Sequence, residues 1–116
     1  MTTDTPDGVN LEMFQEMQEL MEEDFPLLLE TYLDDTPVLL EQINSANSAG
    51  EPASLAAAAH QLKSTSASLG FTVLEELAGK LEAIGNGADA GAAADLYDQA
   101  NANYTQLAPF LTAHLD

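Results

Sequence analysis

The sequence contains no cysteine and no tryptophan, and two lysines are its only strongly basic residues. The absence of cysteine excludes disulfide bonds, thiol nucleophiles and cysteine-ligated zinc or iron–sulfur sites. No apolar run approaches the roughly 20 residues that a membrane-spanning helix needs. The first ten residues carry two acids, no base and no apolar core, so they do not resemble a secretory signal. We therefore expect a cytoplasmic protein.

Positive charge is scarce, because twenty acidic residues against two lysines give a formal net charge of -18. Proteins that bind nucleic acids need clustered cations to replace the counterions condensed on the phosphates. Anionic membrane surfaces select basic segments on the same grounds. We therefore expect neither nucleic acid nor membrane as a partner. Hydrophobic residues make up 46% of the chain, which is enough for one packed interior at this length.

Apolar residues recur with the period of helices between turns rich in glycine, proline and asparagine. Asn10 and Asp24 are the expected N-caps of the first two helices, and Val9 would pack on Phe14 as a staple. Pro37 interrupts the pattern of the second helix, where it predicts a kink or a restart. The predicted helices are 11–21, 24–43 with Pro26 in its first turn, 52–69, 72–84 and one that opens at Asp89 and continues through Leu111.

These five helices, four of them long and all joined by short connections, predict an all-α protein. The expected arrangement is an antiparallel four-helix bundle with a short additional N-terminal helix. We expect the domain to span residues 11–116, with residues 1–10 as a flexible lead, and we expect a monomer.

Few side chains could carry out chemistry, because the only histidines are His60 and His114 and the only lysines are Lys63 and Lys80. A di-iron site in a bundle requires Glu-x-x-His pairs, and neither histidine has a glutamate three residues before it. No glycine-rich phosphate loop and no compelling Ser–His–acid arrangement is present. The sequence thus indicates neither a metal site nor a nucleotide-hydrolysing enzyme. We expect His114 to be a fraying end residue favoured by the helix dipole.

His60 lies within 23 consecutive residues, 52–74, that contain no acid. Residues three, four and seven positions from it share its face on a helix. The side chains on that face are small or basic: Ala56, Lys63, Ser64 and Ala67. A surface histidine on an alanine-rich helix would give the same pattern. The absence of negative charge, however, is what a site visited by a phosphoryl group requires.

Residues 60–70 read His-Gln-Leu-Lys-Ser-Thr-Ser-Ala-Ser-Leu-Gly. They resemble the signature H-x-L-K-(G/S)-x-(S/A)-x-x-L-G of histidine-containing phosphotransfer (HPt) domains, and the resemblance extends over most of the chain. It implies a four-helix bundle whose histidine carries a phosphoryl group between receiver domains in a two-component phosphorelay. The implied partners are response-regulator receiver domains and a hybrid histidine kinase. The implied role is that of a carrier, not an enzyme, without a cofactor of its own, since magnesium belongs to the receiver's acidic pocket.

The resemblance also assigns roles position by position. His60 would be the phospho-acceptor, and Lys63 would stabilise charge on the phosphoryl group. Glu82 stands at the position of a polar residue, often glutamine, that orients the imidazole. By accepting a hydrogen bond from Nδ1 it would leave Nε2 as the nucleophile. Ser64 replaces a frequent glycine and is still small, whereas Lys80 is the only further basic residue nearby in sequence.

A receiver must cover His60, and the strongly acidic remainder of the chain favours an apolar docking patch. Met13, Met17 and Met21 recur at helical spacing on the first helix, which by resemblance lies beside the helix that carries the histidine. The alternative is that these methionines cover the bundle core, with Met13 the most exposed of the three. The predicted docking residues are Ala56, Ser64, Ala67, Met13 and Met17.

An acidic interaction protein, such as a DNA mimic or an adaptor, is the alternative from another functional class. A mimic needs its charge spread along the surface that it presents. Here 12 of the 20 acids lie in the first 41 residues, and residues 52–74 have none. A second alternative is a receiver-binding inhibitor that has lost phosphoryl transfer. The presence of both His60 and Lys63 argues against it.

Overall fold

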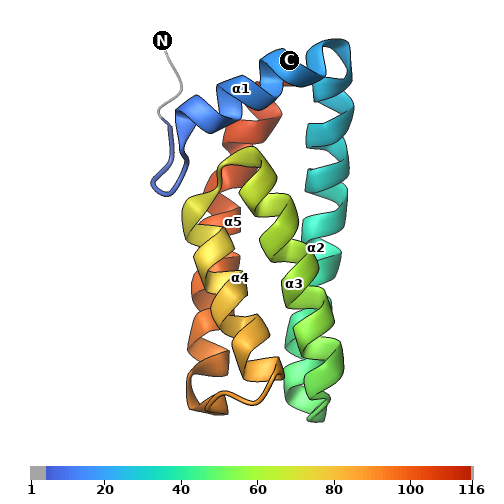
Figure 1. Cartoon of the computed structure of the whole chain (residues 1–116), viewed down its shortest axis with the longest axis vertical. Helices are drawn as coiled ribbons and strands as arrows, with labels where there is room; N and C mark the ends of the chain where they lie inside the picture. Colours follow the sequence, from blue (N-terminus) through green and yellow to red (C-terminus); the bar gives the residue numbers. More distant parts are fainter. Residues whose placement is uncertain (1–4, 116) are drawn as a thin grey trace.

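Five α-helices and two short 3-10 turns make up most of residues 5–115, which the computed structural model describes (Figure 1). The elements are α1 (Leu11–Met21), η1 (Glu22–Asp24), α2 (Phe25–Ala49), α3 (Pro52–Leu69), α4 (Thr72–Gly85), η2 (Ala90–Ala92) and α5 (Ala93–Ala113). The predicted all-α fold is thereby confirmed. Within the described residues, no helix combines the length and the apolar character needed to cross a membrane.

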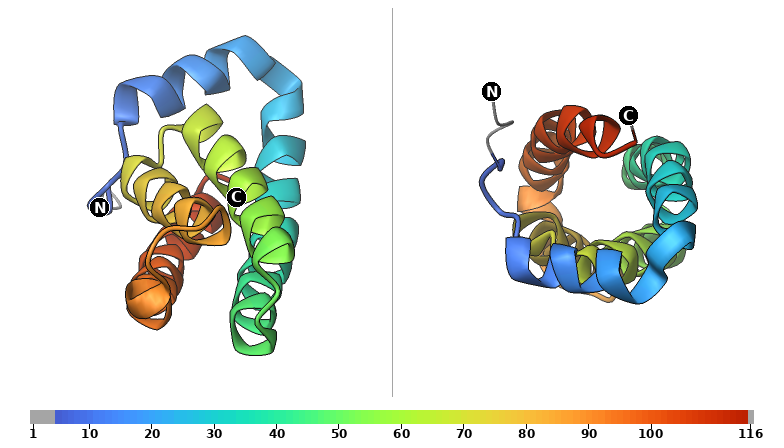
Figure 2. Two further views of the ribbon diagram at one scale, coloured as in Figure 1. Left: turned by 60° about the horizontal axis from the view of Figure 1, so that its bottom comes forward. Right: turned by 90° about the horizontal axis from the view of Figure 1, so that it is seen from above.

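Helices α2 to α5 run alternately down and up the long axis and surround a common centre, as the view from above in Figure 2 shows. Helix α1 crosses one end of this bundle, from the α3–α4 loop to the start of α2. The interior is formed by the apolar stripes that the sequence predicts, and on α3 the buried stripe includes Leu55, Ala59, Leu62, Ser66 and Leu69. Because this stripe points inward, the opposite face of α3, with His60, points outward.

Residues 8–10, which the sequence predicts to be part of a flexible lead, pair with the α3–α4 loop. The backbone N–H of Asn10 donates to the carbonyl of Gly70 at 2.7 Å. The Asn10 side chain caps α1, as predicted, by accepting from the N–H of Met13 at 3.2 Å. Gly70 has a φ of 80°, and a Cβ there would lie 2.8 Å from the Asn10 carbonyl oxygen, so the position requires glycine. Residues 8–10 thus belong to the domain, and residues 1–4 of the predicted lead lie outside the described part.

Asp24 occupies the N-cap position of α2, as predicted, but its side chain does not cap the helix. Asp24 belongs to η1, has a right-handed helical backbone and makes no side-chain capping hydrogen bond. Because the 3-10 turn leads directly into α2, the chain is already wound before Phe25, and the extended conformation that a typical N-cap adopts is absent here.

The predicted restart at Pro37 does not occur, since α2 is one helix from Phe25 to Ala49. Proline has no N–H to donate to the carbonyl four residues earlier, which here belongs to Leu33. The hydroxyl of Tyr104 on α5 donates to that carbonyl at 3.2 Å. A partner from another helix therefore satisfies the acceptor that the proline leaves open.

His114 is held in place, which corrects the expectation of a fraying end residue. Its ring centre lies 4.9 Å from that of Phe14 and 4.7 Å from that of Phe110. Its Nδ1 lies 2.9 Å from the carbonyl oxygen of Phe110. The aromatic contact with α1 was not visible from the position of His114 near the chain end.

Candidate functional site

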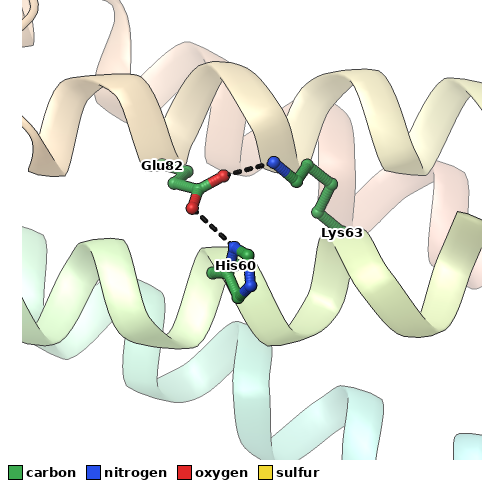
Figure 3. A network of polar contacts seen from close by, with 3 residues as sticks. All are labelled: His60, Lys63 and Glu82. Carbon is green, nitrogen blue, oxygen red and sulfur yellow. Dashed lines mark hydrogen bonds and ion pairs between the residues drawn. The ribbon is translucent and has the colours of Figure 1, made fainter.

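His60 projects from the outer face of α3, and 61% of its side chain is exposed. Its Nδ1 lies 2.6 Å from Oε2 of Glu82 on α4 (Figure 3). An ionised carboxylate can only accept a hydrogen bond, so Nδ1 carries the proton, and in the neutral ring Nε2 then keeps the free lone pair. Figure 3 shows Nε2 on the side of the ring that faces away from Glu82. The arrangement leaves a nucleophilic nitrogen on an open surface.

The second oxygen of Glu82 binds Lys63, whose Nζ lies 2.6 Å from Oε1. The hydrogen bond from Lys63, followed by the one from His60, holds the pKa of Glu82 below its ordinary value, although partial burial opposes this. Glu82 is therefore a carboxylate at neutral pH, with a donor on each oxygen. The structure brings together the three side chains that the sequence predicts as the site, and it places the ammonium of Lys63 on Glu82.

A close approach of α3 and α4 makes this bridge possible. A Cβ on Gly85 would lie 2.6 Å from the backbone nitrogen of Ala56, so this end of the pair requires glycine. One and a half turns earlier on α4, a Cβ on Gly79 would lie 3.4 Å from Cδ of Lys63, which is ordinary contact with the lysine stem. The close approach at Gly85, three residues after Glu82, brings a glutamate on one helix within reach of both donors on the other. Neither Gly85 nor Gly79 stands out in the sequence, because Gly85 reads as a helix end and Gly79 as an isolated helical glycine.

The other lysine does not join the site. Lys80 pairs with Glu76 on the exposed surface of α4, at 3.4 Å. Since Lys63 and Lys80 are the only lysines and arginine is absent, Lys63 is the one strongly basic side chain in contact with the His60–Glu82 pair. No group of three metal-binding side chains is found in residues 5–115.

The predicted docking residues surround His60 unevenly. Ser64 is exposed, and Ala56 and Ala67 are half-buried on the side of α3 near the site. Met13 is 41% exposed, and its Cβ would touch a Cβ placed on Gly70, at the end of α3. Met17 is half-buried and packs against the core. Met13 therefore agrees with a docking surface, whereas the burial of Met17 agrees better with a role in covering the core.

One exposed apolar residue of α1, Leu20, is not among the docking residues that the sequence predicts. Leu20 is 75% exposed and lies seven residues after Met13, which places both on one side of the helix. The spacing i, i+4, i+7 from Met13 through Met17 to Leu20 was the signal that could have found it. These three residues form an apolar stripe whose ends are its most exposed positions.

Comparison with known proteins gives a family match and a structural match. The family model of the Hpt domain matches residues 27–110, which include all of α3 and α4 and exclude α1. The crystal structure of histidine-containing phosphotransfer protein B (HptB) from Pseudomonas aeruginosa PAO1 has the same fold, with a TM-score of 0.90 and 22% sequence identity over 96% of each chain. No curated protein matches the sequence at a significant level.

Proposed function

Because the chain belongs to the Hpt domain family, we propose that it is a phosphorelay intermediate in which His60 receives and passes on the phosphoryl group. The donor would be a phosphorylated aspartate of a receiver domain or a hybrid histidine kinase, and the acceptor the receiver domain of a response regulator. The observation that carries the assignment to His60 is the contact of its Nδ1 with Glu82 on an exposed face of α3, which in the neutral ring makes Nε2 the nucleophilic nitrogen.

The residues support a simple transfer step. The lone pair of Nε2 attacks the phosphorus of the aspartyl phosphate, the P–O bond breaks and the aspartate leaves as a carboxylate. The proton on Nδ1 stays in its hydrogen bond to Glu82 throughout. Lys63 would stabilise charge that develops on the phosphoryl oxygens. Magnesium would be supplied by the acidic pocket of the receiver, and the protein itself would act as a carrier in the cytoplasm, without an ATP site.

Docking would cover His60 from two sides. The small side chains of Ala56, Ser64 and Ala67 allow a partner to approach the imidazole closely. Met13 and Met17 on α1 would contact the receiver at the margin of the patch, with Met13 the more accessible of the two. A single copy of the chain presents all of these groups, which is why we propose a monomer.

The experiment that tests the proposal follows phosphoryl label from a panel of receiver domains charged with acetyl phosphate. The wild-type protein and His114→Gln should both accept the label, and His60→Gln should not. The helical circular dichroism of His60→Gln should be unchanged, because an exposed side chain contributes little to stability. Loss of labelling in His114→Gln alone would refute the assignment. A wild-type protein that no receiver labels would favour the acidic interaction protein instead.

A further inference from the structure

We propose that Glu82 makes the phosphohistidine of this protein short-lived, because its carboxylate holds the Nδ1 proton and so keeps His60 a good leaving group. The inference rests on the proposed function, since it concerns the phosphorylated form of the same histidine. It assigns the protein to prompt transfer and not to storage of the phosphoryl group.

The two contacts of Glu82 are the basis of the inference. Oε2 accepts from Nδ1 of His60 and Oε1 accepts from Nζ of Lys63, each at 2.6 Å (Figure 3). Only 18% of the Glu82 side chain is exposed, so water competes weakly for the carboxylate. Hydrogen bonds to an ionised acceptor are about twice as strong as neutral ones.

Two charged groups belong to the network at the imidazole: Glu82 from α4 contacts Nδ1, and Lys63 from α3 contacts Glu82. Within residues 5–115, no ion pair joins His60 to the other helices packed against α3, which are α1 and α2. The protonation of the phosphorylated ring is therefore governed by Glu82 and Lys63. Of these two groups, only the carboxylate can hold the Nδ1 proton.

The proton on Nδ1 decides how the P–N bond breaks. The electron pair of that bond goes to Nε2. With Nδ1 protonated, His60 leaves as a neutral imidazole, whereas without that proton it would leave as an imidazolate anion, a far poorer leaving group. The phosphoryl group goes either to a receiver carboxylate or to a water molecule. In the second case the water then loses a proton. By holding the Nδ1 proton, Glu82 favours both transfer and hydrolysis.

The ion pair between Lys63 and Glu82 in the unphosphorylated protein also favours a short-lived phosphohistidine. The ammonium of Lys63 is bound to Glu82, and 37% of the lysine side chain is exposed. A phosphoryl group on Nε2 would have to draw the lysine away from the Glu82 carboxylate. Lys63 therefore stabilises the phosphoryl group less than a free ammonium would. The lysine of Glu82→Gln, by contrast, is free to bind the phosphoryl oxygens. The test must separate this contribution from that of the Nδ1 proton.

The test uses phosphoramidate, a small donor that phosphorylates histidine directly and releases ammonia. Wild type and Glu82→Gln are phosphorylated, the donor is removed, and the decay of phosphohistidine is followed by ³¹P NMR across the neutral pH range. We expect the half-life at neutral pH to be about tenfold longer in Glu82→Gln. We also expect its hydrolysis profile to be displaced to lower pH by about one unit, because the neutral amide holds the proton less strongly. Glu82→Ala should shift the profile in the same direction, which guards against a defect peculiar to the glutamine.

Two further variants make the result decisive. Glu76→Gln removes the same charge from α4 at a residue that pairs with Lys80, and its phosphohistidine should decay as in wild type. In a Lys63→Met background, Glu82→Gln should still prolong the half-life; if the gain disappears there, the freed lysine explains it and the inference is overturned. Equal half-lives in wild type and Glu82→Gln overturn the inference alone. A wild-type protein that phosphoramidate does not phosphorylate on His60 overturns the proposed function as well.

Discussion

The ammonium of Lys63 lies 2.6 Å from Oε1 of Glu82, on the carboxylate oxygen that His60 does not use. Lys63 follows His60 by about one turn of α3, and its Nζ crosses to α4 to make this contact. The lysine therefore has two tasks. It helps to keep Glu82 ionised, and it is the strongly basic side chain in contact with the His60–Glu82 pair. Kinetic and titration experiments separate the two.

Lys63→Ala should slow phosphoryl transfer in both directions. The ammonium would act on a transition state whose charge is spread over the phosphoryl oxygens, and removal of one such donor from a closed site costs about 100-fold or more in rate. Because Lys63 is over one-third exposed, we expect a loss of about tenfold. The single-turnover rate constant at saturating receiver measures it, with Lys80→Ala as the matched control. An unchanged rate constant in Lys63→Ala would remove the lysine from the mechanism.

The same substitution should raise the pKa of Glu82 toward its ordinary value of 4.5, because the hydrogen bond from Lys63 is the largest cause of its depression. A carboxyl whose pKa is lowered by folding contributes stability above its unfolded pKa, and that stability is lost as the pH falls through the folded value. Wild type should therefore lose the contribution of Glu82 to the free energy of unfolding as the pH falls below 4.5. In Lys63→Ala this loss should be smaller. Carboxyl carbon NMR titration measures the pKa directly. The same pKa in both proteins would show that the lysine contact is absent in solution.

The fold was largely predictable because the helices are defined by local patterns. The stripe Leu55, Ala59, Leu62, Ser66 and Leu69 is readable from sequence spacing alone, and it determines that His60 points outward. The spacing of His60 and Lys63 is likewise set by one helix. Glu82 comes from a second helix, and its role could be expected only from the family resemblance.

The features that sequence reasoning missed depend on contacts between distant segments. Asp24 reads as a cap until the 3-10 turn between α1 and α2 is known. Gly70 reads as an ordinary helix end, although it also makes room for Asn10, sixty residues earlier. Gly85 faces the backbone of Ala56 across the helix pair. In each case the neighbouring residues in sequence carry no sign of the segment that packs against them.

Met13→Asp should weaken binding of a receiver more than it weakens folding. Met13 is 41% exposed beside Gly70, at the end of α3, so a carboxylate there stays hydrated in the free protein but would be desolvated under a partner. The matched variant is Met17→Asp, whose side chain packs against the core and should lower the thermal midpoint instead. Titration calorimetry with a receiver and thermal unfolding give the two quantities. Unchanged receiver affinity in Met13→Asp, or a collapse of its midpoint, would favour a purely structural role for this methionine.

Tyr104→Phe should destabilise the bundle through α2. The Tyr104 hydroxyl donates to the carbonyl of Leu33 at 3.2 Å, and Pro37 cannot donate to that carbonyl. Burial, followed by the negative charge of Asp34, raises the pKa of Tyr104, so the hydroxyl keeps its proton throughout the neutral range. Its removal leaves a half-buried acceptor unpaired, at a cost of about 1 kcal/mol in the free energy of unfolding. Urea denaturation measures the loss, with Tyr97→Phe on the same helix as control.

Pro37→Ala provides the decisive background for this prediction. Alanine restores an N–H that can donate to Leu33, so the carbonyl no longer depends on α5. If the proline is the reason for the contact, Tyr104→Phe should cost much less in Pro37→Ala than in wild type, and the difference is the coupling energy of a double-mutant cycle. We expect a coupling of about 0.5–1 kcal/mol. Additive effects would mean that the Tyr104 hydroxyl stabilises the bundle independently of Pro37, and that α2 tolerates its proline for another reason.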